Sequence, residues 1–198
     1  GNAADLATFL AGASATDNCD MDVDITNNYT ALSNGCGATG NATVTFTATD
    51  DCGNTSTCSA TFTITDTTNP SIDTGASNET VECDGSGNTA ALNAWLADNG
   101  GAEASDVCGG VTWTNNHSAL SDDCGATGST TVTFTATDDC GNASTTQATF
   151  TIEDTTAPEW DEYAIYAYAA CEDVPDPTDP TLVPITASDD CGSVTYTI

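Results

Sequence analysis

The sequence predicts an all-β protein made of tandem β-sandwich domains, each with a short helix inserted after its first strand. Two observations carry this prediction. A long internal repeat divides the chain into similar copies, and within each copy short runs of β-branched residues alternate with turn residues. Several short strands separated by turns at intervals are typical of a sandwich.

The internal repeat has an offset of 88 residues. Residues 32–70 return as residues 120–158 with 30 of 39 positions identical, and Val44–Asn54 recurs unchanged as Val132–Asn142. A period of this length corresponds to one small domain per copy rather than to one turn of a solenoid. The expected domains are 1–70, a repeat that lacks its first strand, 71–158, a complete repeat, and 159–198, the start of a third repeat.

A helix is predicted early in each copy. Residues 89–98 carry apolar side chains at positions i, i+3 and i+4, which form one face of a helix, and two glycines follow at 100–101. Residues 3–10 show the same pattern in the first copy. The apolar residues are Leu92, Trp95 and Leu96 in one helix and Leu6, Phe9 and Leu10 in the other.

A β-hairpin is predicted later in each copy. Residues 43–49 and 60–65 are rich in threonine and alternate strictly with apolar side chains, and the turn cluster Asp50–Asn54 lies between them. One face should therefore be buried and the other covered by threonine. The apolar face consists of Val44, Phe46, Ala48, Phe62 and Ile64 in the first copy and of Val132, Phe134, Phe150 and Ile152 in the second.

Each copy ends in an Asp-Thr-Thr-x-Pro segment, at Asp66–Pro70 and at Asp154–Pro158. Proline fixes its own backbone and restricts the residue before it. We therefore expect compact junctions between the copies rather than flexible linkers.

The charge of the chain is entirely one-sided. There is no Lys or Arg against 30 Asp and Glu, which gives a formal net charge of -30. Salt bridges are thus excluded as a stabilising device, and nucleic acid and anionic membrane surfaces would repel the chain. No apolar run is long enough for membrane insertion. Hard divalent cations such as Ca²⁺ bind carboxylate and carbonyl oxygens; the alternative is an acidic surface solvated by water.

The chain contains 10 cysteines. None of them form a C-x-x-C pair, and zinc sites usually have such closely spaced ligands. This cysteine content predicts disulfides in an oxidising, extracellular compartment.

Four motifs in a fixed order resemble the hyalin-repeat (HYR-like) modules of secreted bacterial surface proteins. They are Val81–Asp84, Ala104–Gly109, Thr135–Asn142 and Asp154–Pro158. The resemblance covers nearly the whole chain. It implies an immunoglobulin-like β-sandwich, tandem arrays and a role in adhesion or extracellular scaffolding, and it implies no catalytic residues.

In an immunoglobulin-like sandwich the B–C and F–G loops lie at the same end, which predicts disulfides between them. The predicted pairs are Cys108–Cys140, by repeat Cys19–Cys52, and from the remaining cysteines Cys83–Cys124. Cys36, Cys58, Cys171 and Cys191 have no assigned partner, although a Cys36–Cys58 bond stays open.

The same topology brings the end of one domain to the loop end of the next, where carboxylates should gather. The predicted metal ligands are Asp66, Asp106, Asp138 and Asp139 at one junction and Asp154, Asp189 and Asp190 at the other. Carboxylates so close together favour a structural Ca²⁺ ion. The alternative is that these aspartates cap turns.

The sequence therefore predicts a structural extracellular protein, a segment of a filament, stalk or adhesin. The alternatives are a glycan- or surface-binding adhesive module and, less favoured, an ice-binding one. An enzyme is not expected, because the sequence has no Lys or Arg to stabilise an oxyanion and shows no recognisable nucleophile–base pair. The expected partners are further repeats or copies of the chain, head to tail. Tyr163–Tyr168 is expected to be the first strand of a domain completed either by more of the same chain or by the next subunit.

Overall fold

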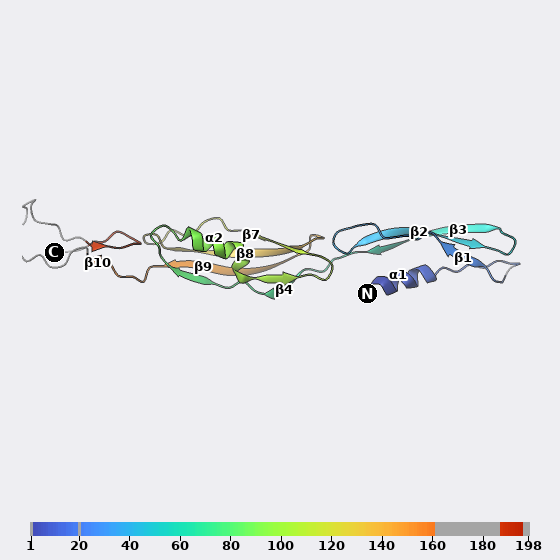
Figure 1. Ribbon diagram of the computed structural model, residues 1–198, viewed down its shortest axis with the longest axis horizontal. Helices are drawn as coiled ribbons and strands as arrows, with labels where there is room; N and C mark the ends of the chain where they lie inside the picture. Colours follow the sequence, from blue (N-terminus) through green and yellow to red (C-terminus); the bar gives the residue numbers. More distant parts are fainter. Residues whose placement is uncertain (1, 20, 161–186, 196–198) are drawn as a thin grey trace, which may run out of the picture. The chain divides into compact units, whose positions relative to one another are not determined.

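The structure is a computed structural model that describes residues 2–19, 21–160 and 187–195 (Figure 1). The proposed strand Tyr163–Tyr168, the cysteine Cys171 and most of the predicted third copy lie outside these residues. None of the described helices is long and apolar enough to cross a bilayer.

The described elements are short helices and a larger number of strands. The helices are α1 (Asn2–Ala11), α2 (Thr89–Ala97) and the 3-10 helix η1 (Asn99–Gly101). The strands are β1 (Asp24–Asn27), β2 (Gly40–Thr49), β3 (Thr55–Ile64), β4 (Ser71–Thr74), β5 (Glu79–Glu82), β6 (Glu103–Ser105), β7 (Val111–Asn115), β8 (Gly128–Asp138), β9 (Ala143–Glu153), β10 (Glu159–Trp160) and β11 (Ala187–Ser188).

These strands form small sheets, and the predicted all-β fold is confirmed. The strand orders are β1-β2-β3, β5-β9-β8-β7, β4-β6 and β10-β11. Both predicted helices are also present, with bounds within a residue or so of those expected.

The chain divides into two compact units, each assembled from three stretches. The first comprises Gly1–Asp73, Ala104–Thr114 and Thr135–Thr145, and the second Thr74–Glu103, Asn115–Phe134 and Thr146–Ile198. The domain boundaries expected from the repeat, at residues 70 and 158, stay a prediction.

In the first unit, the predicted hairpin forms with its apolar face against helix α1. Strands β2 and β3 pair antiparallel from Gly40 opposite Ile64 to Thr49 opposite Thr55. The ring of Phe9 in α1 lies 5.8 Å from that of Phe46 and 5.4 Å from that of Phe62. The apolar face of α1 is therefore what covers this hairpin.

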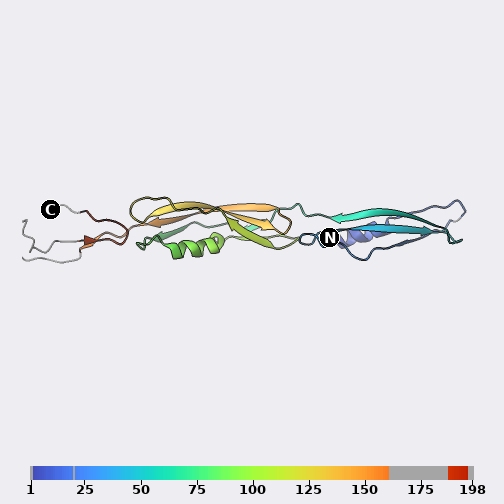
Figure 2. The same cartoon turned by 90° about the horizontal axis from the view of Figure 1, so that it is seen from above.

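In the second unit, helix α2 packs on its sheet in the same way. Figure 2 shows α2, in green, running alongside the strands of its unit. The ring of Trp95 lies 5.3 Å from that of Phe134 and 5.5 Å from that of Phe150. Its indole N–H donates to the carbonyl of Ser77 at 3.1 Å. The polar atom of this large buried side chain is thus satisfied.

Gly100 ends the α2 region with a φ of 65°. A Cβ at this position would lie 3.2 Å from the Phe134 ring and 3.3 Å from Trp95 Nε1. Glycine is therefore required both by the left-handed backbone and by the close approach of the core.

The two hairpins differ in how well their apolar faces are covered. Phe150 and Ile152 of β9 are buried, whereas their counterparts Phe62 and Ile64 of β3 are only half-buried. Strand β5 pairs in parallel with β9, but β3 is an edge strand within the part of the chain that the structure describes. The prediction of a fully buried face therefore holds for the second copy and only in part for the first.

The threonine-covered faces are hydrogen-bonded across the strands. Thr43 Oγ1 and Thr61 Oγ1 lie 3.0 Å apart, and their counterparts Thr131 and Thr149 lie 2.9 Å apart. Cross-strand hydroxyl pairs of this kind stabilise a sheet.

Candidate functional site

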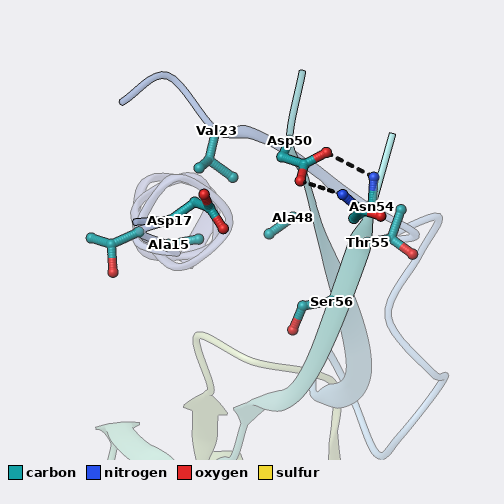
Figure 3. Close-up of a pocket in the computed structure, with 9 residues that line it drawn as sticks. Ala15, Asp17, Val23, Ala48, Asp50, Asn54, Thr55 and Ser56 are labelled. Carbon is teal, nitrogen blue, oxygen red and sulfur yellow. Dashed lines mark hydrogen bonds between the residues drawn. The ribbon is translucent and has the colours of Figure 1, made fainter. Parts of the chain in front are cut away.

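The candidate site is built from two kinds of loop and the carboxylates beside them. The first kind is the Asp-Asp-Cys-Gly-Asn turn that follows strand β2 and strand β8. In the turn Asp50–Asn54 the Asp50 carboxylate accepts hydrogen bonds from the backbone N–H of Cys52 at 2.9 Å and from that of Asn54 at 2.7 Å. Asn54 Nδ2 donates to its other oxygen at 2.7 Å (Figure 3). These bonds, led by the one from the Asn54 side chain, lower the pKa of Asp50.

The turn Asp138–Asn142 repeats this geometry. Asp138 accepts from the backbone N–H of Cys140 at 2.8 Å and of Asn142 at 2.9 Å, and from Asn142 Nδ2 at 2.8 Å. Burial raises the pKa of Asp138, but these hydrogen bonds outweigh it and leave the pKa below its ordinary value. The alternative that the predicted metal ligands cap turns is therefore borne out for Asp138, and Asp50 does the same in the first copy. Each of four further predicted ligands accepts a hydrogen bond from the backbone N–H two residues on; they are Asp66, Asp106, Asp154 and Asp189.

A cavity of about 340 Å³ lies beside the Asp50 turn (Figure 3). Its lining is mostly small side chains such as Ala15, Ala48 and Ser56. The Asp50 carboxylate at its edge points to Asn54 and not into the open space.

The Cys-Gly-Ala-Thr loops are the second component. In the loop Cys36–Thr39 the Thr39 N–H and Oγ1 donate to the Cys36 carbonyl at 3.0 and 2.6 Å. The Ala38 N–H donates to the carbonyl of Cys108 at 2.6 Å. A Cβ on Gly37 would collide with that same carbonyl, so the glycine permits the close approach.

A disulfide joins the loop Cys36–Thr39 to the turn Asp138–Asn142. It links Cys36 to Cys140 with a Cα–Cα distance of 5.0 Å, and both residues belong to the first unit. The predicted Cys108–Cys140 pair is therefore wrong. The turn Asp138–Asn142 of the second copy faces the loop Cys36–Thr39 of the first copy, so the bond joins consecutive repeats rather than two loops of one repeat.

A second disulfide lies in the second unit, between Cys83 and Cys191 with a Cα–Cα distance of 5.9 Å. The predicted Cys83–Cys124 pair is wrong as well, because Cys83 is bonded to Cys191 of the following copy. The predicted Cys19–Cys52 pair is absent as well. Among the described cysteines, those without a disulfide are Cys19, Cys52, Cys58, Cys108 and Cys124.

Two groups of possible metal ligands occur among the described residues, one in each unit. Asp66, Asp106 and Cys108 form the first, and Asp154, Asp189 and Cys191 the second; within each group the ligand atoms lie within 4.8 Å of one another. The two groups occupy equivalent positions of consecutive copies. The structure thus brings together the Asp66/Asp106 and Asp154/Asp189 pairs expected from the sequence.

The other predicted metal ligands lie outside these groups. Asp138 caps its own turn, although it is close enough for its charge to act on Cys108. The Asp139 carboxylate accepts a hydrogen bond from the Gly110 N–H at 2.9 Å. Asp190 is exposed, and its backbone carbonyl lies against Gly85.

The donor chemistry of the two groups fits a hard cation better than zinc. Burial, followed by the charges of Asp66, Asp106 and Asp138, raises the pKa of the Cys108 thiol. Cys191 is bound to Cys83 and offers no thiolate. Each of the two groups contains a pair of carboxylates, and carboxylate oxygens are ligands that Ca²⁺ prefers.

No family model matches this sequence, and no curated protein matches it. Among solved structures, the chain is similar to EC1-3 of mouse clustered PcdhgC3, with a TM-score of 0.26 and 15% sequence identity. The match covers 64% of this chain and 48% of that one, so it spans about half of the solved structure. A likeness of this degree carries no argument about function, and the resemblance to hyalin repeats stays a hypothesis.

Proposed function

We propose that this chain is a structural extracellular repeat protein, a segment of a filament, stalk or adhesin that assembles head to tail. The observation that carries the proposal is the pairing of cysteines between consecutive copies, Cys36 with Cys140 and Cys83 with Cys191. A bond of this kind ties one repeat to the next. A covalent link between consecutive repeats would help an array resist mechanical load, whereas it is not required for catalysis within one domain.

The composition supports a structural rather than a catalytic role. The sequence has no Lys or Arg to stabilise a developing negative charge. In the described turns the carboxylates of Asp50 and Asp138 are engaged by backbone and asparagine donors. Groups held in this way build the fold and are not available for acid–base chemistry.

Negative-stain electron microscopy of the purified chain tests the proposal. We expect beaded single chains for a stalk or long ordered fibres for a polymer. Isolated compact particles under all salt and Ca²⁺ conditions would contradict it.

We further propose that Ca²⁺ binds at the Asp66/Asp106 and Asp154/Asp189 pairs. The support is the approach of two carboxylates within 4.8 Å in a chain that holds no Lys or Arg to neutralise them. A bound cation would supply that charge and hold the end of one copy against the loop of the next. The two carboxylates supply part of its oxygen shell.

Removal of Ca²⁺ should therefore lower the melting temperature. The variants Asp106→Asn and Asp189→Asn should each reduce the effect of a chelator, because each removes one ligand charge. Calorimetric titration with CaCl₂ at constant ionic strength gives the binding, and constant ionic strength separates it from general screening. Asp73→Asn, at an exposed position outside both groups, is the control. A melting temperature that a chelator does not change would contradict the proposal.

A further inference from the structure

The sequence contains six Asn-x-Ser/Thr sequons with a residue other than proline in the middle, the motif at which N-linked glycans are attached to secreted proteins. Such a short motif also arises by chance in a chain rich in asparagine and threonine. The folded structure therefore has to decide which side-chain amide is able to carry a glycan. The sequons begin at Asn28, Asn41, Asn54, Asn78, Asn116 and Asn142.

Two of these asparagines use the amide nitrogen to hold a turn together. Asn54 Nδ2 donates to the Asp50 carboxylate at 2.7 Å, and Asn142 Nδ2 donates to the Asp138 carboxylate at 2.8 Å. A glycan is attached to this same nitrogen. Modification of Asn54 or Asn142 would therefore place a sugar where the turn needs a hydrogen-bond donor.

Three further asparagines have a side-chain amide whose orientation is fixed by the backbone. In each of them Oδ1 accepts a hydrogen bond from the N–H of a residue in a neighbouring strand. Their amide groups are therefore not free to turn. The pairs are Asn28 with Thr45 at 2.8 Å, Asn78 with Thr149 at 2.9 Å and Asn116 with Thr133 at 2.8 Å.

Asn41 is the sequon asparagine whose amide has neither role. Its side chain is exposed and makes no hydrogen bond within the part of the chain that the structure describes. Its backbone is nevertheless well held, because its N–H donates to Ser33 Oγ at 2.9 Å and its carbonyl accepts from the Ser33 N–H at 2.7 Å. A glycan on Asn41 Nδ2 would thus cost the fold none of these hydrogen bonds.

The strand also displays the two side chains of this sequon together. Asn41 and Thr43 both lie in β2, and residues two apart in a strand project from the same face. Both are exposed, and the Thr43 hydroxyl lies 3.0 Å from that of Thr61. Asn41–Thr43 is the one sequon of the six that lies wholly within a strand.

The surface around Asn41 suits a carbohydrate. Although the chain has 30 Asp and Glu, the rows of β2 and β3 nearest to this residue on the same face carry only hydroxyl and amide side chains. A sugar packed on this face would exchange hydrogen bonds with neutral groups and would not strip water from a carboxylate. The rows are Asn41 opposite Thr63, Thr43 opposite Thr61 and Thr45 opposite Ser59.

We propose that Asn41 is an acceptor site for an N-linked glycan. The inference rests on the proposed extracellular location, because N-linked glycans are found on exported chains. The donor is an oligosaccharide linked to a lipid through a diphosphate. Asn41 Nδ2 attacks the anomeric carbon of its first sugar, and the N–C bond forms as the C–O bond to the diphosphate breaks. The lipid diphosphate leaves with the electron pair, and the transferase takes the proton that Nδ2 loses.

The test is to secrete the full chain from a host whose export pathway attaches N-linked glycans. The intact mass should be that of the chain plus a glycan, and an amidase that releases N-linked glycans should remove the difference. Peptide mapping locates the site, with a protease that cleaves at acidic residues because trypsin has no site in this chain. Asn41 should be occupied, whereas Asn54 and Asn142 should be unmodified.

Two kinds of variant identify the sequon itself. Asn41→Gln removes the acceptor nitrogen from its position, and Thr43→Val removes the hydroxyl while leaving Asn41 unchanged, so both should lose the glycan at this site. Thr43→Ser keeps the motif and should keep the glycan. Circular dichroism checks that each variant is folded.

A folded, secreted chain without a glycan at Asn41 would overturn the inference, as would higher occupancy at Asn54 or Asn142 than at Asn41. Electron microscopy of the same preparation separates this result from the proposed function. Beaded chains or fibres with an unmodified Asn41 overturn the inference alone. Isolated compact particles under all conditions overturn the proposed function, whatever Asn41 carries.

Discussion

At the scale of single residues, several carboxylates of this chain are held by neutral hydrogen-bond donors, in a sequence without Lys or Arg. Asp50 and Asp138 each accept from two backbone N–H groups and from an asparagine Nδ2. Glu82 is held similarly by the Thr155 N–H at 2.9 Å, followed by threonine hydroxyls, and these bonds lower its pKa. Donors of this kind stabilise the charged form and so make stability depend on pH.

The first prediction concerns the pH dependence that Asp138 contributes. Its folded-state pKa lies below that of an unfolded aspartate, which is about 3.9. Its contribution is therefore fully present above that value and is lost as the pH falls through the lower, folded-state pKa. Asp138→Asn should melt below wild type at neutral pH, and the difference should shrink as the pH is lowered past about 4.

Thermal unfolding followed by circular dichroism between neutral and strongly acidic pH measures this difference. The exposed residue Asp73 provides the matched control, since Asp73→Asn should leave the pH profile of wild type unchanged. If the difference in melting temperature between wild type and Asp138→Asn stayed constant at all pH values, the lost carboxylate charge would not be the cause of the destabilisation.

At the scale of elements, each helix is anchored to its sheet by one aromatic side chain. Trp95 of α2 contacts Phe134 and Phe150, and Phe9 of α1 contacts the equivalent Phe46 and Phe62. Trp95 is 6% exposed, whereas Phe9 is only half-buried. The two helices therefore play the same role with unequal contributions to stability.

The second prediction follows from this inequality. Trp95→Ala should cost about 3–5 kcal/mol, since it removes a buried aromatic ring and leaves a cavity. Phe9→Ala should cost less, because part of the ring is already in water. Hydrogen exchange should show each loss in the sheet that the helix covers, β8 and β9 for Trp95 and β2 and β3 for Phe9. Equal decreases in the free energy of unfolding for Trp95→Ala and Phe9→Ala would contradict the prediction.

At the scale of the whole molecule, the two disulfides among the described residues close long segments of chain. The bonded cysteines are separated by 104 residues for Cys36–Cys140 and by 108 for Cys83–Cys191. A cross-link over such a distance restricts the unfolded chain strongly. These bonds compensate for cores that consist largely of threonine-flanked strands with few large apolar residues.

The third prediction is that Cys36→Ser lowers the free energy of unfolding by about 2–5 kcal/mol. Chemical denaturation measures the change, and reductant should shift wild type further than this variant, which keeps Cys83–Cys191 but not Cys36–Cys140 of the disulfides in the described residues. Cys58→Ser removes an exposed cysteine that has no disulfide and should leave the midpoint unchanged. Identical midpoints for Cys36→Ser and Cys58→Ser would contradict the prediction.

The sequence by itself determined the local elements, because their signals are local. The alternation around Phe46 and Phe134 marks the strands, the i, i+3, i+4 spacing around Trp95 marks a helix, and the Asp-Asp-Cys-Gly-Asn clusters mark the turns. The pairing of Asp66 with Asp106 also followed from the repeat and the expected loop positions.

Only the tertiary structure decided which cysteines pair. A disulfide requires its two Cα atoms to be about 4.4–6.8 Å apart, and no periodicity in the sequence records a distance between residues a hundred positions apart. Cys140 lies in a turn at the same end of its repeat as Cys108, yet its Cα is 5.0 Å from that of Cys36 in the preceding copy. The packing of one repeat's loop against the next repeat's turn decides which cysteines bond.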